Sequence, residues 1–590
     1  MKKIIDLLEE KISKAFEESG YDSKYAGVTI SNRPDLCEYQ CNGSMPAAKQ
    51  YKKAPFEIAS SVVEKLTDKT VFKEINVVNP GFINIILHEG FVSEYVNSMK
   101  DEPDRGMDKS EEKLKIIIDY GGANIAKPLH VGHLRSAIIG ESIKRICKFM
   151  GHDVIGDVHL GDWGLQMGLI ITELKERQPK LPYFDENFEG EYPQEAPFTI
   201  GELEEIYPAA NAKSKTDETF KDAARVATYE LQSGRRGYFA LWRHILNVSV
   251  ADLKVNYDNL DVHFEEWKKE SDAQPYIPEM VEYMKREGYT RVSDGALVVD
   301  VKEETDNKEI PPCMIIKSDG ATLYNTTDLA TIVERKKLFD PNHIIYVVDK
   351  RQGLYFEQIF RCAKKTKLVD DKTRFTFIGF GTMNGKDGKP FKTRDGGVMR
   401  LEDLITSINE AVYNKIMENR VETEEEARRV AEIVGLSALK YGDLSNQATK
   451  DYVFDIDRFT SFEGNTGPYI LYTIVRIKSI LEKYKERFPE SAAKAADILP
   501  AEQIQEKNLM LELLKYNEVI ESAYEELAPH RLCAYVFDLA NAFNKFYHET
   551  NILAQEDIER QMSYVRLIVL VKEILEQCIN LLGFEAPDRM

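Results

Sequence analysis

The spacing of hydrophobic and polar residues divides the chain into three kinds of segment. The first twenty residues carry an amphipathic helical pattern, and short strand and helix patterns alternate from there to about residue 105. The polar stretch KDEPDRGMDKSEEK follows and predicts a linker. From about residue 455 onward the pattern is that of long helices with few strand signals, which predicts a separate helical domain.

The segment between these regions opens with a strand, a glycine-containing loop and a helix. LKIIIDY (114–120) is an apolar run of strand length, typical of a buried parallel strand. The helix after it carries apolar residues at helical spacing, namely Ile139, Ile143, Ile146 and Met150. HIIYVVD (343–349) and FTFIGFG (375–381) predict later strands of the same sheet. This order is typical of a doubly wound nucleotide-binding fold.

The sequence therefore predicts a multidomain α/β protein. We expect a Rossmann-like domain with an inserted segment, preceded by an α+β domain and followed by an all-α domain. The expected boundaries are 1–105 for the first domain, 113–385 for the Rossmann-like domain with its insertion at about 175–310, 386–455 for a connecting segment and 456–590 for the helical domain.

Composition narrows the class of protein. A chain of 590 residues is too long for a single core, and its contents of 43% hydrophobic and 30% charged residues are those of a globular protein. No apolar run approaches the roughly 18 residues that span a bilayer. The first residues mix acidic and basic side chains, unlike a signal or transit peptide. We therefore expect a cytoplasmic protein with no membrane partner.

Cysteine usage argues against a structural metal. The seven cysteines are scattered and form no CxxC motif, which is typical of a reducing compartment. Cys37 and Cys41 are the only close pair, and a zinc site would need two further ligands. We expect no zinc and no other resident metal.

Net charge leaves the class of partner open. The chain has 78 basic and 99 acidic residues, a formal charge of −21. On that count alone nucleic acid is disfavoured, because phosphate binding depends on Lys and Arg. A local basic face can coexist with an acidic total, however, so composition does not decide the question.

The stretch KPLHVGHLRS (127–136) carries His130 and His133, three residues apart, where a strand-like run gives way to a helix. A zinc pair would need a third ligand, and Gly132 between the histidines would serve no purpose in it. A second interpretation is that the two histidines are structural and form local hydrogen bonds at the end of the helix. A phosphate site explains more, because a helix N-terminus binds anions and a glycine lets a base or ribose approach the backbone. Lys127 would add positive charge.

Blocks of sequence along the whole chain resemble one enzyme family. GGANIAKPLHVGHLRSAIIGES resembles the HIGH-motif region of class I aminoacyl-tRNA synthetases, and specifically of the arginyl-tRNA synthetases. Further blocks follow in that family's order, namely HLGDWGLQMGLI (159–170), LYNTTDLAT (323–331), YVVDKRQGLYF (346–356), GKPFKTRDGGVMRLEDL (388–404), DYVFDIDRFTSFEGNTGPYILY (451–472) and the ending NLLGFEAPDRM. A chance resemblance would not reproduce so many blocks in the same order.

The resemblance implies an arginine–tRNA ligase. Such an enzyme forms arginyl-adenylate from L-arginine and ATP, with Mg²⁺ accompanying ATP, and transfers arginine to the 2′-OH of the terminal adenosine of tRNA(Arg) for protein synthesis. Catalysis then depends on positioning and charge, and no protein nucleophile is needed. The implied partners are tRNA(Arg), L-arginine and ATP, and we expect a monomer.

The same resemblance places the catalytic and ATP-binding residues in two segments. In the HIGH-like motif they are Lys127, His130, Gly132 and His133. The second class I signature, KMSKS, is replaced here by KPFKTRDG (389–396), with Pro390 and Asp395 where a family lysine could stand. The candidates for stabilising the departing pyrophosphate are Lys389, Lys392 and Arg394, with Lys392 also expected to bind ATP. A solvated basic turn is the alternative.

An arginine substrate needs carboxylates, because a guanidinium presents five donors in a planar fork. Asp119 ends the first strand, at the sheet edge where open α/β sheets bind ligands, and Asp328 follows Tyr324 by one helical turn. The resemblance implies that these three residues hold the guanidinium. It also places Asn124 and Gln352 at the α-amino group, with His130 nearby. Taken singly, each acid would be interpreted as a helix cap or a surface ion pair.

The flanking domains resemble the tRNA-reading parts of the same family. NPGFINIIL (79–87) resembles the element that these enzymes use on the D-loop, which implies that Asn79, Phe82 and Asn84 hold a looped-out base. A core position is the alternative for Phe82. The segment 528–553 resembles the helical anticodon-binding domain named for a D-A-L-R motif. Its aromatic stripe is at helical spacing and indicates core packing rather than base stacking: Phe543, Phe546 and Tyr547.

Two other functions remain open at this point. A class I ligase for lysine or cysteine would keep the HIGH chemistry and change the pocket, although the zinc ligands of the cysteine enzyme are absent. A non-enzymatic, RNA-binding or regulatory relative is expected to have lost the histidines of HVGH, and this chain retains both.

Overall fold

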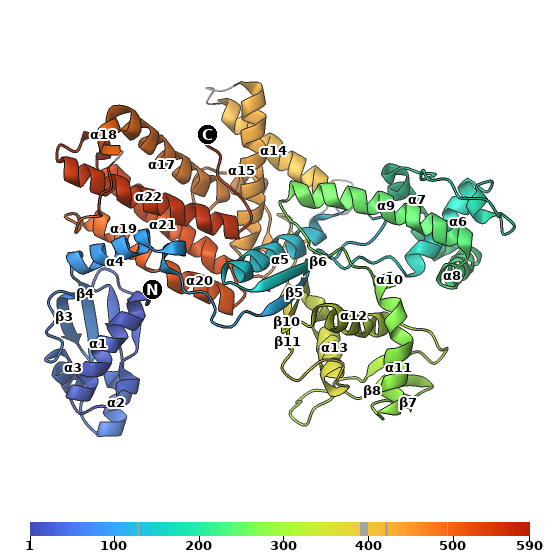
Figure 1. Cartoon of the computed structure of the whole chain (residues 1–590), viewed down its shortest axis with the longest axis horizontal. Coiled ribbons are helices and arrows are strands. Elements are labelled where there is room, and N and C mark those ends of the chain that lie inside the picture. Colours follow the sequence, from blue (N-terminus) through green and yellow to red (C-terminus); the bar gives the residue numbers. More distant parts are fainter. Residues whose placement is uncertain (128, 390–398, 419–422, 493) are drawn as a thin grey trace.

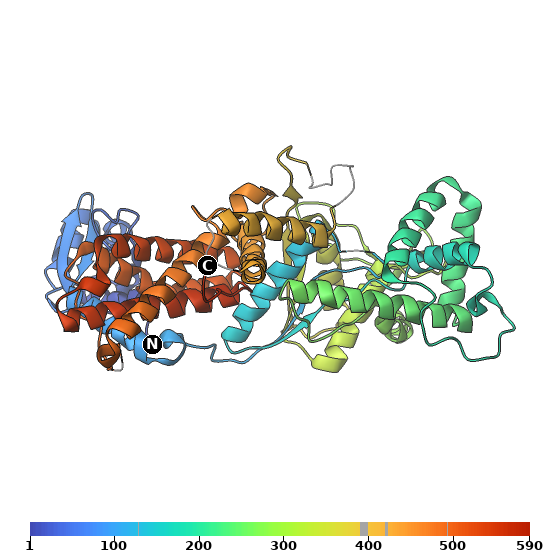
Figure 2. The ribbon, with the colours of Figure 1, turned by 90° about the horizontal axis from the view of Figure 1, so that it is seen from above.

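The computed structural model describes the chain except for residues 128, 390–398, 419–422 and 493. Figure 1 shows an elongated molecule, with the N-terminal α+β domain and the C-terminal helices at one end and the inserted helices at the other. The parallel sheet lies between them, and Figure 2 shows the same order after a 90° turn. No helix in the described part of the chain is long and apolar enough to cross a membrane.

The N-terminal domain is an antiparallel sheet covered by helices. Its elements are α1 (Ile4–Glu18), β1 (Val28–Ile30), β2 (Tyr39–Cys41), α2 (Ser44–Tyr51), α3 (Pro55–Val63), β3 (Phe72–Val78), β4 (Phe82–Leu87) and α4 (Glu89–Asp101). The strands pair in the order β1-β2-β4-β3. Ile83, Ile85 and Leu87 of β4 are buried in the core, so the alternate residues Phe82 and Asn84 lie on the other face of the sheet.

The central sheet is fully parallel, with strand order β11-β10-β5-β6. Its strands and the helices next to them are β5 (Lys115–Asp119), α5 (Val131–Phe149), β6 (Asp153–Asp157), α12 (Tyr324–Phe339), β10 (His343–Asp349), α13 (Gly353–Lys365) and β11 (Arg374–Phe380). The three predicted strands and the Rossmann-like class are confirmed, and β6 was not predicted. Asp119 lies opposite Asp157 in register, so two carboxylates meet at the carboxyl edge of the sheet.

The insertion between β6 and α12 contains helices and a small antiparallel sheet. Its elements are α6 (Leu165–Arg177), α7 (Ile200–Thr216), α8 (Glu218–Gln232), α9 (Arg236–Asn259), α10 (Glu270–Ala273), α11 (Ile277–Arg286), β7 (Arg291–Ser293), β8 (Ala296–Val299) and β9 (Cys313–Ile316). The chain returns to the central sheet at its edge, where the N–H of Glu266 donates to the carbonyl of Gly156 at 3.0 Å and that of Glu270 donates to Leu160 at 3.0 Å. The start of α10 is therefore fixed beside the carboxyl end of β6.

The remainder of the chain is almost entirely helical. Its elements are β12 (Met383–Asn384), α14 (Leu401–Glu418), α15 (Glu424–Leu444), β13 (Tyr452–Val453), α16 (Ile456–Phe459), α17 (Gly467–Arg487), α18 (Pro489–Ala492), α19 (Ile504–Leu514), α20 (Tyr516–Glu525), α21 (Pro529–Glu549) and α22 (Ile558–Leu581). Phe543 and Phe546 are fully buried and Tyr547 packs against the same core, which confirms the prediction that this aromatic stripe is structural.

Helix α5 joins the central sheet to the helical domain. The Nε of Arg135 donates to Asp443 Oδ2 on α15 at 2.9 Å, and both side chains are buried. The hydroxyl of Ser142 donates to the carbonyl of Leu581 at 2.9 Å. These contacts fix the helix that carries the two histidines against both α15 and α22.

A buried lysine lies in the same junction. Lys440 of α15 is fully buried, and its Nζ donates to the carbonyls of Gly583 and Asp261. Burial, together with the nearby charge of Arg145, lowers the pKa of Lys440 to about 7. No carboxylate lies within ion-pair distance of this ammonium group in the described residues.

Candidate active site

The N-terminus of α5 is built around the two histidines. The Nδ1 of His130, the N-cap residue, accepts a hydrogen bond from the N–H of Gly132 at 3.0 Å. The Nδ1 of His133 accepts from the N–H of His130 at 3.2 Å, and the ring centroids are 4.0 Å apart. A Cβ at Gly132 would lie 2.7 Å from the His130 ring, so this capping arrangement requires the glycine. That a nucleotide also approaches Gly132 stays a prediction.

Both rings are neutral and present the same donor. Because each Nδ1 accepts a backbone N–H, the proton of each neutral ring is assigned to Nε2. Burial and the charges of His130 and Lys127 lower the pKa of His133 to about 3, and burial followed by Lys127 lowers the pKa of His130. No described group binds either Nε2. The pair therefore offers two uncharged N–H donors at a helix N-terminus, where anions bind.

Of the lysines predicted for this site, Lys127 and Lys389 are among the described residues. The ammonium of Lys127 lies over the Tyr207 ring of α7, 4.9 Å from its centroid. Lys389 is exposed, whereas Lys392 and Arg394 lie outside the described residues. The chain after them returns to the HIGH-like motif, because Val131 N–H donates to Met399 and Leu401 N–H donates to Leu129, at 3.2 and 2.9 Å. This pairing places Arg400 opposite His130 in an isolated antiparallel bridge.

The carboxylate of Asp119 is bound by an arginine of the protein itself. Arg335 of α12 donates from Nη2 to Asp119 Oδ2 and to Asp157 Oδ2, each at 2.6 Å. Asp119, Asp157 and His159 form the one set of potential metal ligands found in the described residues, with ligand atoms within 4.8 Å of one another. The Arg335 guanidinium binds both carboxylates of that set, so a metal does not fit there as well.

Asp328 lies on the same helix and is held by a tyrosine. The hydroxyl of Tyr355 on α13 donates to Asp328 Oδ2. Burial raises the pKa of Asp328, and the hydrogen bond from Tyr355 opposes that rise. No described group binds the other oxygen, Oδ1. Tyr324, one turn earlier, leaves 70% of its surface exposed at the N-terminus of α12.

A pocket of about 240 Å³ opens beside Tyr324. It is lined by Trp163, Gly164, Leu165, Gln232, Glu270, Gln274, Lys317, Thr322, Leu323, Tyr324 and Thr327. Burial, together with the charges of Asp162 and Asp328, raises the pKa of Glu270 to about 7, and burial raises the pKa of Asp162 to about 6. Glu270 is the one carboxylate in this lining, together with Lys317, and the charges of Asp162 and Asp328 act on it from nearby. A carboxyl group with a raised pKa in a pocket is a candidate for ligand binding.

The two residues predicted for the α-amino group lie at loop positions after strands. Asn124 follows β5 and forms an isolated bridge with Gly161, where a Cβ would lie 2.5 Å from the Asn124 side-chain oxygen. Gln352 follows β10 and is exposed. Neither lines the pocket beside Tyr324. Their contact with the α-amino group stays a prediction.

Three residues of the site were missed by the sequence analysis. Arg335, Tyr355 and Glu270 each contact or influence one of the predicted aspartates. A signal was present for Arg335, which follows Asp328 by two helical turns and therefore lies on the same face of α12. Tyr355 falls inside the quoted block YVVDKRQGLYF, and Glu270 had no signal beyond its charge.

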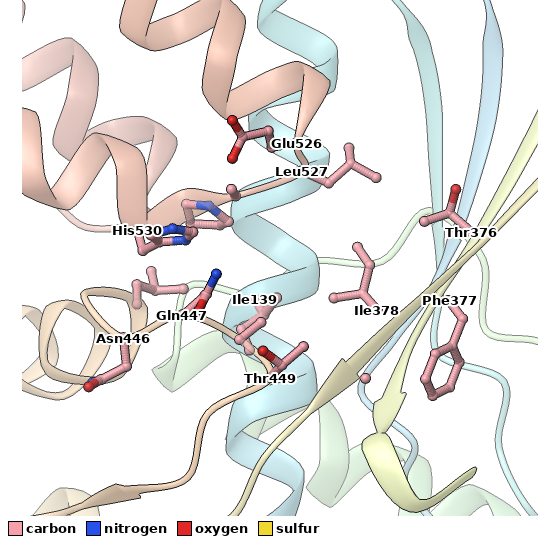
Figure 3. Close-up of a pocket in the computed structure, with 15 residues that line it drawn as sticks. Ile139, Thr376, Phe377, Ile378, Asn446, Gln447, Thr449, Glu526, Leu527 and His530 are labelled. Carbon is pink, nitrogen blue, oxygen red and sulfur yellow. The ribbon is translucent and has the colours of Figure 1, made fainter. Parts of the chain in front are cut away.

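A separate pocket lies where the central sheet meets the helical domain (Figure 3). It has a volume of about 280 Å³, and its lining includes Ile139 of α5, Ile378 of β11, Thr449 and His530. None of the predicted site residues lines it. It is therefore distinct from the pocket beside Tyr324.

Of the predicted tRNA contacts in the N-terminal domain, Phe82 and the buried Asn84 lie on the face of β4 opposite its core residues, and Asn79 lies in the turn between β3 and β4. Asn79 is exposed, Phe82 is partly exposed, and Asn84 accepts a hydrogen bond from Gln40 at 2.8 Å. The alternative of a core position for Phe82 is wrong, because the core residues of β4 point to the opposite face.

Comparison with known families decides the class of protein. The family model described as tRNA synthetases class I (R), catalytic domain matches residues 96–456. Models described as Arginyl tRNA synthetase N terminal domain and DALR anticodon binding domain match residues 2–87 and 470–590. The chain belongs to the arginyl-tRNA synthetase family. This membership confirms the resemblance and excludes the assignment to a lysine or cysteine family.

Individual members of the arginyl-tRNA synthetase family match over the full length. The arginine–tRNA ligases of Agathobacter rectalis and Alkaliphilus oremlandii are 64% and 58% identical, each covering 100% of both chains. The crystal structure of arginyl-tRNA synthetase from Plasmodium falciparum aligns with a TM-score of 0.82 at 26% identity, covering 100% of both chains. The Thermus thermophilus arginyl-tRNA synthetase aligns with a TM-score of 0.75 at 20% identity, and it supports the fold alone.

Proposed function

We propose that this protein is an arginine–tRNA ligase. In the first step the carboxylate of L-arginine attacks the α-phosphate of ATP in line, which gives arginyl-adenylate and pyrophosphate. In the second step the 2′-OH of the terminal adenosine of tRNA(Arg) attacks the mixed anhydride, and AMP leaves. The protein forms no covalent intermediate, so its contribution is orientation and charge stabilisation.

The observation that carries the proposal is that two aspartates each have one bound and one unbound carboxylate oxygen. Asp119 and Asp328 each have one oxygen bound by the protein, through Arg335 and Tyr355, while the other oxygen has no partner among the described residues. Two oriented acceptors of this kind match the planar fork of a guanidinium. We assign the substrate guanidinium to these two carboxylates, with Tyr324 beside it and the α-amino group toward Asn124, His130 and Gln352.

The histidine pair suits the α-phosphate of ATP. Two neutral Nε2–H donors at the start of α5 stabilise the charge that develops on this phosphate without requiring a change of protonation. We assign ATP to Lys127, His130, Gly132 and His133. Lys389 and Lys392 are assigned to the departing pyrophosphate, and Lys392 lies outside the described residues. Mg²⁺ would enter with ATP as part of the substrate.

The two flanking domains are proposed to bind tRNA. We assign Asn79, in the turn before β4, and Phe82 and Asn84 of β4 to a looped-out base of the D-loop, and the helical domain to the anticodon. We divide the chain at residues 1–105, 113–385, 386–455 and 456–590. The family matches at 2–87, 96–456 and 470–590 support the first and last of these parts, and one model spans the two in between. A cytoplasmic monomer is the form we propose for the active enzyme.

The test is a screen of labelled amino acids for attachment to total tRNA by the purified full chain. We expect attachment of arginine alone, at the 2′-OH of the terminal adenosine. We also expect ATP–pyrophosphate exchange with arginine only when cognate tRNA is present, because the bound terminal adenosine completes the site. Attachment of a different amino acid would contradict the substrate, and tRNA binding without any attachment would identify a non-enzymatic relative.

A further inference from the structure

A buried arginine lies behind the proposed guanidinium site. Only 2% of the Arg335 side chain is exposed, and its Nη2 binds both Asp119 and Asp157. Its remaining donors, Nε and Nη1, have no acceptor in the part of the chain that the structure describes. Its guanidinium lies 5.4 Å from the centroid of the Tyr346 ring. The two aspartates are thus the strong contacts that determine where this guanidinium lies.

Asp157 holds the Arg335 guanidinium in a fixed position. Its Oδ1 accepts hydrogen bonds from the N–H groups of His159 and Lys268, at 3.1 and 3.2 Å, and its Oδ2 accepts from Arg335. Burial alone would raise the pKa of Asp157, but Arg335 and His159 keep this pKa below its ordinary value. A buried, ionised carboxylate with both oxygens bound cannot rotate freely, so it holds the Arg335 guanidinium in one place.

The carboxylate of Asp119 is held less firmly than that of Asp157. Its Oδ2 is bound by Arg335, and no described group binds its Oδ1. With a single bond to the protein, the direction of this carboxylate depends on where the guanidinium lies. Arg335 also shares a face of α12 with Asp328, two turns away, so one side chain is linked to both proposed substrate contacts.

We propose that Arg335 is a positioning residue for the arginine substrate: anchored by Asp157, it orients the free oxygen of Asp119 toward the substrate guanidinium. Its single positive charge also offsets part of the negative charge of the two strand-end carboxylates, and Asp328 is left to pair with the substrate. The inference rests on the proposed function. Without a cation at position 335, Asp119, Asp157 and Asp328 would repel one another in a partly buried space, and Asp119 would lose its orientation.

The test measures steady-state arginylation by the full chain and its variants, each with its melting temperature. Arg335→Met should raise KM for arginine by roughly 10- to 100-fold, because small misplacements of a binding group have effects of that size. KM for ATP should stay within about threefold of wild type, since the histidine pair is untouched. Arg335→Lys restores one positive charge without the planar fork, so it should recover part of the loss.

Two further variants separate positioning from folding. Arg335→Met combined with Asp119→Asn should raise KM for arginine no more than the worse single change, because Arg335 acts through Asp119. Arg361→Met is the matched control: Arg361 of α13 also binds two carboxylates, Asp306 and Glu357, but belongs to no proposed substrate contact. This control should leave KM for arginine unchanged.

The outcomes distinguish this inference from the proposed function. Suppose that the wild-type protein arginylates tRNA, and that Arg335→Met or Arg335→Lys is soluble and folded, keeps the wild-type KM for arginine and only melts at a lower temperature. The inference is then wrong, and Arg335 is purely structural. If Arg335→Met does not fold, Asp157→Asn provides the same test, since it removes the anchor and retains the arginine. If wild type itself attaches no arginine, the proposed function is wrong.

Discussion

At the scale of single residues, the chemistry of the proposed ATP site depends on which nitrogen of each histidine carries the proton. Backbone N–H groups occupy both Nδ1 atoms, so both Nε2–H groups remain available as donors. The lowered pKa of His133, about 3, and the lowered pKa of His130 keep both rings neutral through the physiological range. The donors therefore have the same protonation before and during phosphate attack.

Replacement of either histidine should lower the rate of activation more than ATP binding. His130→Ala or His133→Ala is expected to reduce kcat by about 10²–10³, the effect of losing one oriented donor, with a smaller change in KM for ATP. His133→Gln, whose amide nitrogen can occupy the place of Nε2, should lose less than His133→Asn. The measurement is single-turnover adenylate formation with saturating tRNA. A kcat that falls as pH rises from 6 to 7 would contradict the neutral form.

Asp328 should control arginine binding without controlling stability. In Asp328→Asn an N–H₂ group meets the donors of the substrate, and loss of such a buried charged pair costs about 30- to several-thousand-fold in affinity. KM for arginine should therefore rise by about 30-fold or more, while KM for ATP and the melting temperature change little. Tyr355→Phe, which keeps the charge and removes the hydrogen bond to Oδ2, should have a smaller effect. Early melting with unchanged arginine KM would show that Asp328 is a structural cap.

The sequence names candidate residues for this site, and it does not give the contacts that these residues make within the protein. Asp119 and Asp328 could be assigned because they stand in family blocks at a strand end and on a helix. The bond between Arg335 and Asp119 could not, since it joins positions separated by 216 residues and depends on how α12 packs against the sheet. Tyr355 binds Asp328 from α13, and Asp328 acts through its charge on Glu270 of α10, so these relations too arise only in the folded chain.

At the scale of elements, continuous apolar runs were sufficient to predict the inner strands. β5 and β10 are central in the parallel sheet and are buried on both faces, so their residues are apolar without alternation. β6 was not predicted, because it lies at the edge of the sheet and its five residues, DVIGD, begin and end with aspartate. A short edge strand with polar ends has no pattern that separates it from a loop.

The alternation along β4 gives a direct test of the proposed D-loop contact. Phe82→Ala removes an aromatic surface from the face of β4 opposite its core residues, so KM for tRNA should rise, with base stacking contributing about 1–3 kcal/mol. The melting temperature should barely change. The neighbouring Ile83→Ala is the matched control: it empties a fully buried position and should lower stability by about 2–5 kcal/mol. Equal tRNA KM values for Phe82→Ala and wild type would contradict the assignment.

At the scale of the whole molecule, the domains are joined by buried polar contacts rather than by a flexible linker. Lys507 of α19 lies 2.6 Å from Glu38 and donates to the carbonyl of Leu87, which fixes the N-terminal domain to the helical domain. Arg135 fixes α5 to α15 through Asp443, and Lys440 of α15 donates to Asp261 in the insertion and to Gly583 at the end of the helical domain. Figure 2 shows the result, in which the proposed tRNA-reading parts extend to one side of the sheet as a single body.

Lys440 makes the stability of this assembly depend on pH. Its pKa falls from the ordinary value of 10.5 to about 7 on folding, so between these values the unfolded chain binds a proton that the folded chain does not. Stability should therefore rise with pH across this window, by about 2 kcal/mol from pH 7 to pH 9 for this one group. In Lys440→Met, the free energy of unfolding measured in urea should not show this rise between pH 7 and pH 9, whatever the absolute stability of the variant. Parallel pH dependence in both proteins would contradict the assignment.

The contacts between α5 and α22 also set an order of events during synthesis. Ser142 and Arg145 donate to the carbonyls of Leu581 and Asn580, which the ribosome makes 439 and 435 residues later. At about 5–20 residues per second, roughly twenty to ninety seconds pass before those acceptors exist. Until then the helix bearing both histidines lacks part of its support, and a nascent chain arrested before residue 580 should show no arginylation. Each new copy would thus begin work only after the ribosome has added Asn580 and Leu581.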